Sequence, residues 1–166
     1  DDVQEINGTK FKNKVDLLVG GAPCQSFSMV GKRLGLKDIR GNLTLHFIKK
    51  INEIKPKVFI FENVRALLSV DNGDAWKIIY NKFKQTGYTF YYNTLNAKNF
   101  GIPQNRERLF VIGFKNKQNF LFPQPIKLKN TMQDYLEGQF DKKFYLPPKG
   151  VAFVTKNKNL KKRYTQ

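Results

Sequence analysis

The sequence predicts an α/β fold, and three features of its 166 residues indicate this. Short apolar runs alternate with longer segments whose apolar residues recur at helical spacing. Reactive polar residues directly follow two of the apolar runs. In an open α/β sheet, the carboxyl ends of the strands form the crevice where ligands bind. We therefore expect the functional residues to gather at one edge of a sheet.

The first predicted strand is the apolar run at residues 15–19, which is followed by a loop that holds the single cysteine. The run is too short for a globular helix and ends at two glycines, which favours a buried strand. Cys24 lies between Pro23 and Gln25, so its neighbours in the loop are not aliphatic. A thiol at this position is placed for attack on a substrate. A small buried cysteine without a chemical role is the alternative that the loop alone leaves open.

A basic loop and a helix are predicted next. Residues 29–41 interleave glycines with basic residues, which is typical of a mobile, positively charged loop. Asn42 is suited to cap a helix that ends at Lys55 and Pro56. His46 lies off the apolar face of this helix, so we interpret it as structural or exposed. That face consists of Leu43, Phe47, Ile48, Ile51 and Ile54.

The second predicted strand, residues 58–61, runs directly into Glu62. A carboxylate at the end of a buried strand has two open interpretations. It could form a structural ion pair with Arg106 or Arg108, or it could be desolvated and act as an acid. Both interpretations place Glu62 at the functional edge of the sheet.

The α/β pattern continues beyond Glu62. An amphipathic helix is predicted over residues 74–85, after the turn signal Asp-Asn-Gly, and Gly87 is suited to close it. Residues 88–95 and 109–114 are predicted strands. The apolar face of the helix consists of Trp76, Ile79, Tyr80 and Phe83.

Two arginines precede the last of these strands. Arg106 and Arg108 lie two residues apart, so on extended backbone they project to the same side. Two guanidiniums on one side suit a phosphate, or a carbonyl oxygen together with a partnering carboxylate. A surface ion-pair cluster with Glu107 is the alternative.

Composition bounds the class of protein. The chain has 30 Lys and Arg against 13 Asp and Glu, a net charge of +17. Such an excess favours a polyanionic partner, because each neutralised phosphate releases counterions. A lysine bias on a solvated surface is the alternative.

One cysteine excludes an intrachain disulfide, and one histidine argues against a protein-only zinc site. With no apolar run of membrane-spanning length and no signal peptide, we expect a cytoplasmic protein with no membrane partner.

Three motifs in one order carry a resemblance to a known family. They are Pro-Cys-Gln at 23–25, Glu-Asn-Val at 62–64 and Gln-x-Arg-x-Arg at 104–108, with about forty residues between each. In this order they resemble the catalytic core of a DNA cytosine-5 methyltransferase of the restriction-modification type. The resemblance implies a partial Rossmann-like sheet that uses S-adenosylmethionine in residues 1–115. It implies a linker and the beginning of a target-recognition region in residues 116–166, where a short helix is predicted over 131–136.

The resemblance also implies residue roles. Cys24 would add to carbon 6 of a cytosine flipped out of duplex DNA, Glu62 would act at N3, and Arg106 and Arg108 would hold O2 or a neighbouring phosphate. The residues implied for S-adenosylmethionine are Asp2, Val3, Pro23 and Leu43. Those implied for DNA, in the cysteine loop and the basic loop that would close over the duplex, are Gln25, Ser28, Lys32, Arg33 and Arg40.

The sequence departs from the family pattern at both ends. The Gly-rich cofactor-binding strand and loop do not precede Asp1, and the closing cofactor segments do not follow Gln166. We therefore expect a fragment or one half of a split enzyme, completed by a complementary chain and inactive alone, from a prokaryote. The alternatives are a related transfer-RNA cytosine-5 methyltransferase, an inactive remnant that binds nucleic acid by charge, and a basic RNA-binding module with a structural cysteine.

Overall fold

The computed structural model describes residues 2–22, 39–138 and 141–156, with backbone alone at 39–42 and 142. Six predicted site residues therefore lie outside the described residues: Pro23, Cys24, Gln25, Ser28, Lys32 and Arg33. The chain forms two compact units, Asp1–Asn130 and Thr131–Gln166. The first unit contains the whole sheet and every predicted site residue that is described.

The first unit is built on a mixed four-stranded sheet with the order β1-β2-β4-β3. The strands are β1 (Leu17–Gly21), β2 (Val58–Val64), β3 (Thr89–Asn96) and β4 (Glu107–Phe114). β1 and β2 are parallel, whereas β4 is antiparallel to both of its neighbours, β2 and β3. The resemblance implies a partial Rossmann-like sheet, and the structure contains a mixed sheet with one parallel pair. The connection between β3 and β4 is short, which suits their antiparallel pairing, because a parallel pair needs a longer crossover.

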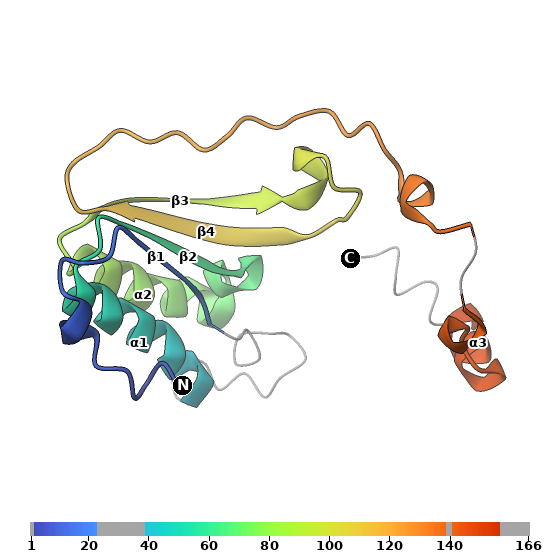
Figure 1. Cartoon of the computed structure of the whole chain (residues 1–166), viewed down its shortest axis with the longest axis horizontal. Coiled ribbons are helices and arrows are strands. Elements are labelled where there is room, and N and C mark those ends of the chain that lie inside the picture. Colours follow the sequence, from blue (N-terminus) through green and yellow to red (C-terminus); the bar gives the residue numbers. More distant parts are fainter. Residues whose placement is uncertain (1, 23–38, 139–140, 157–166) are drawn as a thin grey trace. The chain divides into compact units, whose positions relative to one another are not determined.

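Two helices, α1 (Ile39–Ile54) and α2 (Asp74–Lys84), cover one face of the sheet (Figure 1). Side chains that alternate along β2 and β4 meet these helices, as expected for strands with one face in the core. The Phe59 ring stacks on Phe83 of α2, with centroids 5.4 Å apart and planes at 11°. The fully buried core consists of Ile51, Phe59, Phe61, Leu67, Ile79, Phe83, Leu109 and Val111.

Most element boundaries agree with the sequence prediction to within two residues, although β2 continues three residues beyond the predicted end at residue 61. The start of α1 also differs, because the helix begins at Ile39; Gly41 and Asn42 lie in its first turn, so Asn42 is not the predicted cap. Gly41 was expected to belong to the loop, but a helix tolerates a glycine at a modest entropic cost. The helix α2 ends at Lys84, and Gly87 adopts a φ of 79°, the left-handed conformation expected of a residue just beyond a helix.

The N-terminal segment is fastened to α1 through a buried lysine. Lys50 is 5% exposed, and its Nζ lies 2.8 Å from Glu53 Oε2 and also donates to the Ile6 carbonyl. Glu53 in turn accepts the Gly8 N–H at 3.1 Å. The hydrogen bond from Lys50 holds the pKa of Glu53 below its usual value.

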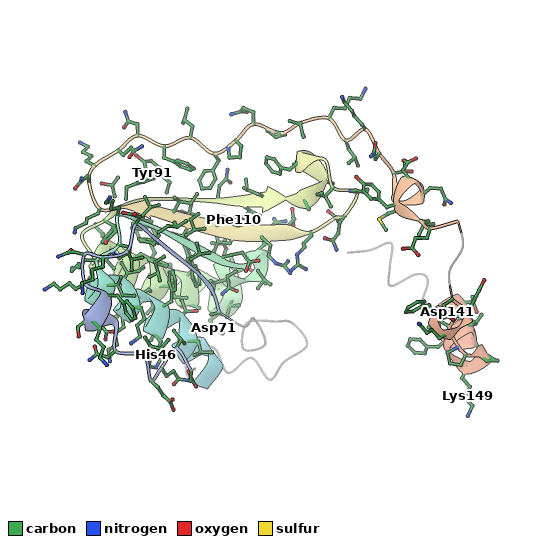
Figure 2. The ribbon with its side chains drawn as sticks, in the orientation of Figure 1. His46, Asp71, Tyr91, Phe110, Asp141 and Lys149 are labelled. Atoms are coloured by element: carbon green, nitrogen blue, oxygen red, sulfur yellow. The ribbon has the colours of Figure 1, made fainter. Side chains whose placement is uncertain are left out.

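A strap over residues 115–130 packs along the sheet face opposite the helices (Figure 2). The Phe120 ring contacts Tyr91 of β3 and Phe114 of β4, at centroid distances of 6.0 and 5.6 Å. The Tyr91 hydroxyl donates to the Gln118 carbonyl at 2.8 Å. The strap then returns to the turn after β3, where Ile126 N–H donates to the Asn99 carbonyl at 2.8 Å.

The second unit contains short helices. A 3-10 helix spans Met132–Tyr135, and Thr131 and Asp134 form a capping box at its start, as the predicted threonine cap requires. The helix α3 spans Pro148–Thr155. None of the helices within the described ranges is long and apolar enough to cross a bilayer.

Candidate active site

The site begins where β1 and β2 end side by side. The parallel register pairs Gly21 with Glu62, so the carboxyl ends of both strands share one edge of the sheet. A Cβ atom added at Gly21 would lie 3.0 Å from Glu62 Oε2 and 3.3 Å from the Glu62 carbonyl oxygen. Because glycine has no side chain, residue 21 does not crowd the Glu62 carboxylate.

An ion pair joins Glu62 to Arg108. Arg108 Nε lies 3.0 Å from Glu62 Oε1, and the two side chains are 23% and 36% exposed respectively. Arg108 Nη1 also donates to the Glu107 carbonyl at 2.8 Å, which fixes the guanidinium further. The antiparallel register, which places Arg108 opposite Val64, brings the start of β4 to the end of β2. The mixed topology of the sheet thus creates the pair.

Glu62, Arg106 and Arg108 line one cavity of about 290 Å³. A carboxylate and two guanidiniums can together accept and donate hydrogen bonds around a planar polar ring. Arg106 and Arg108, which the sequence predicts to project to the same side, both line this cavity. The remaining lining residues are mostly apolar, and they are Leu95, Asn96, Ala97, Phe100 and Phe110.

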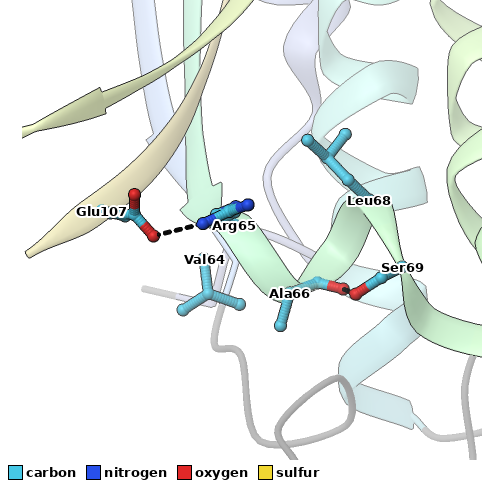
Figure 3. A pocket seen from close by; sticks show the side chains of 6 residues that line it. All are labelled: Val64, Arg65, Ala66, Leu68, Ser69 and Glu107. Atoms are coloured by element: carbon cyan, nitrogen blue, oxygen red, sulfur yellow. Dashed lines mark hydrogen bonds and ion pairs between the residues drawn. The ribbon is translucent and has the colours of Figure 1, made fainter. Parts of the chain in front are cut away.

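A neighbouring hollow of about 560 Å³ is lined by Val64 and Arg65, at the carboxyl end of β2 (Figure 3). Arg65 Nη1 forms an ion pair with Glu107 Oε2, which also lines the hollow, at 2.7 Å. The alternative of an ion-pair cluster between Glu107 and its two flanking arginines is therefore wrong. The Glu107 carboxylate points to Arg65, and Arg108 pairs with Glu62.

Two asparagines that the sequence analysis left without a role support this edge. Asn63 is 1% exposed, and its Nδ2 donates to the Ala22 carbonyl at 3.4 Å, just before the cysteine loop. Asn96 is 7% exposed and hydrogen bonds to the backbone of Arg106. Asn96 carries a detectable sequence signal, since an asparagine at the end of a strand before a glycine turn is suited to cap the turn.

Of the residues implied for the cofactor, Asp2, Val3 and Leu43 are described. Asp2 is exposed, and its Oδ1 accepts the Gln4 N–H at 2.9 Å. Val3 is 40% exposed, and Leu43 is half-buried in α1. Of the described residues, none of these three lines the 290 Å³ cavity. Arg40, the one residue implied for DNA that lies in a described element, is in the first turn of α1.

The sequence matches the family model of the C-5 cytosine-specific DNA methylase over residues 1–165. It is 43% identical over 136 residues to the type II methyltransferase M.SsoII of Shigella sonnei, covering 79% of this chain and 36% of that protein. It is 41% identical over 162 residues to the type II methyltransferase M.Bsp6I of a Bacillus species, covering 93% and 51%. The chain thus spans about half or less of the length of these relatives.

The fold is similar to a solved methyltransferase structure from Entamoeba histolytica. The TM-score is 0.70 at 20% sequence identity, over 89% of this chain and 47% of that one. The mixed sheet with its two helices is therefore an arrangement that a solved methyltransferase shares.

Proposed function

The chain belongs to the C-5 cytosine-specific DNA methylase family, and from this membership we propose that it methylates carbon 5 of cytosine in duplex DNA within a restriction-modification system. The observation that supports this most is the cavity in which Glu62, Arg106 and Arg108 meet, at the edge where β1 leads toward Cys24. The net charge of +17 supports a nucleic-acid substrate.

Carbon 5 of cytosine becomes nucleophilic only after a group adds at carbon 6. In this proposal the Cys24 thiolate forms a bond to carbon 6, and the electron pair of the 5,6 double bond moves into the ring. Glu62 holds a proton at N3, where it neutralises the charge that develops. Once carbon 5 carries the methyl group, a base removes its proton, the C–H electron pair re-forms the 5,6 double bond, and the bond from carbon 6 to sulfur breaks. N3 then returns its proton to Glu62, which restores the aromatic ring and the Cys24 thiolate.

The arginines supply fixed positive charge for this intermediate. Arg108, which binds Glu62 and the Glu107 carbonyl, would donate to O2 of the ring. Arg106, which is exposed and lines the cavity, would contact O2 or the adjacent phosphate. A base stacked in a duplex cannot reach either group, so the substrate cytosine must be flipped out of the helix.

S-adenosylmethionine, when bound, supplies the activated methyl group. The exposed carboxylate of Asp2 fits the hydrogen-bond donors of a nucleoside, and the exposed side chain of Val3 fits the face of its base. Asp2, Val3, Pro23 and Leu43 are the residues we propose to hold it. The polar contacts of Lys50 and Glu53 fasten the Asp2 segment to α1.

The decisive test is covalent trapping on duplex DNA that contains 5-fluorocytosine. Because fluorine cannot leave as the proton does, the Cys24 adduct persists and is visible on a denaturing gel. The chain is assayed alone and joined to the flanking segments of M.Bsp6I, with S-adenosylmethionine and with Cys24→Ser as the control. A cofactor-dependent adduct that Cys24→Ser abolishes is expected from the joined protein, and we expect none from the chain alone.

Two results would contradict the proposal. One is a folded joined protein that forms no adduct on DNA. The other is an adduct on a transfer RNA that contains 5-fluorocytosine and none on the duplex, which would identify the related RNA enzyme instead.

A further inference from the structure

The buried side chain of Asn96 connects both sides of the turn between β3 and β4. Its Oδ1 accepts two backbone N–H groups, from Arg106 at 3.1 Å and from Lys98 at 3.3 Å. Its Nδ2 donates to Asn105 Oδ1 at 2.7 Å. One amide, 7% exposed, thus organises both ends of the turn at residues 97–106.

Arg106 needs this support because it lies just outside the regular sheet. The last pair of the β3–β4 ladder joins Asn96 to Glu107, so Arg106 is one residue beyond it. The Arg106 carbonyl accepts the Ala97 N–H at 3.1 Å, and the Arg106 N–H donates to Asn96 Oδ1. Gln104 and Asn105, which precede it, are exposed. The backbone of Arg106 is therefore fixed from the β3 side.

We infer that Asn96 is a positioning residue that holds Arg106 at the cavity, an inference that rests on the role of Arg106 proposed above. Removing the Asn96 side chain leaves the Arg106 and Lys98 N–H groups without their acceptor and Asn105 without its donor. Arg106 would then sample several positions, and a misplaced guanidinium stabilises developing charge poorly.

A double-mutant cycle tests this inference in the joined protein. Adduct formation on the 5-fluorocytosine duplex is compared for Asn96→Ala, for Arg106→Ala and for the two combined. If Asn96 acts through Arg106, each single variant slows the adduct by about 10-fold and the double variant is no slower than the slower single one. Asn93→Ala is the matched control, because Asn93 lies on the same strand, is exposed, and accepts the adjacent Thr94 N–H at 2.8 Å.

A purely structural role predicts a different result. In that case Asn96→Ala lowers the melting temperature, and the double variant is slowed by the product of the two single fold-changes. That result would overturn the inference. Asn96→Asp, which keeps the acceptor oxygen for Arg106, is expected to retain most of the rate. If the alanine variant does not fold, Asn96→Asp decides alone: a normal melting temperature together with adduct formation as slow as in Arg106→Ala would overturn the inference.

The two proposals fail in distinguishable ways. A normal adduct rate for Arg106→Ala would remove Arg106 from the proposed mechanism and this inference with it. If Arg106→Ala is slow and the double variant is slowed by the product of the two single fold-changes, only the inference about Asn96 fails, and the proposed role of Arg106 stands.

Discussion

Glu62 and Arg108 form an ion pair between neighbouring antiparallel strands, with Arg108 Nε 3.0 Å from Glu62 Oε1. The pair confirms one of the two interpretations of Glu62, a bridge to an arginine. The guanidinium fixes the orientation of the carboxylate that the proposed reaction uses at N3. The pair therefore connects the fold to the proposed reaction.

Arg108→Lys should slow the adduct far more than it destabilises the protein. Lysine keeps the charge but lacks the planar fork that reaches both Glu62 and the Glu107 carbonyl. We expect adduct formation about 10-fold slower or more. A partly exposed ion pair contributes about 1 kcal/mol or less, so the melting temperature should change little. The control is Arg65→Lys, whose pair with Glu107 lies at the other hollow. Equal slowing by both variants would contradict the assignment.

Gly21→Ala should move the Glu62 carboxylate. The added methyl carbon would lie 3.0 Å from Glu62 Oε2, so the carboxylate must shift by a few tenths of an ångström. Because catalytic groups tolerate little displacement, we expect adduct formation slower by about threefold to tenfold. Gly138→Ala is the control, because a Cβ there meets nothing within 4 Å. An unchanged rate for Gly21→Ala would show that Glu62 does not need its present position.

Local sequence patterns predicted the elements of the site better than they predicted its assembly. Both strands follow from short apolar runs, but the structure extends them, β2 beyond Glu62 to Val64 and β4 back from Leu109 to Glu107. The place of β4 between β2 and β3 does not follow from such runs, since strand order depends on tertiary pairing. The ion pair of Glu62 depends on that strand order, so the sequence alone could not decide between Arg106 and Arg108 as its partner.

Asn96 and Glu107 show a second limit of sequence analysis. Asn96 resembles an ordinary turn residue until its contact with Arg106, ten positions away, is seen. Glu107 lies between two arginines in sequence, yet its carboxylate pairs with Arg65, 42 positions away. On an extended strand, adjacent side chains point to opposite sides, so sequence neighbours are poor guides to ion pairs.

Lys50→Met should destabilise the first unit, whereas Lys49→Met should not. Lys50 is 5% exposed and binds both Glu53 and the Ile6 carbonyl. Its loss removes the lysine donor from the Ile6 carbonyl and from Glu53, which costs about 1–3 kcal/mol of unfolding free energy. The Lys49 side chain is 65% exposed and its Nζ lies 3.8 Å from Glu53 Oε1, so we expect Lys49→Met to change the unfolding free energy by no more than about 0.5 kcal/mol. Urea unfolding measures both, and equal losses would contradict the buried contact.

Acid should weaken the same contact. The hydrogen bond from Lys50 lowers the pKa of Glu53 in the folded protein from its usual 4.5. A carboxyl whose folded pKa is lower contributes stability above its unfolded pKa, and this contribution is lost as the pH falls through the folded pKa. The difference in unfolding free energy between wild type and Lys50→Met should therefore shrink as the pH falls below about 4.5. Lys49→Met should keep the wild-type pH dependence, because Lys50, not Lys49, is the largest cause of the low pKa. Urea unfolding at a series of pH values measures these differences, and a gap that stays constant into acid would mean that the Lys50 contact does not depend on the charge of Glu53.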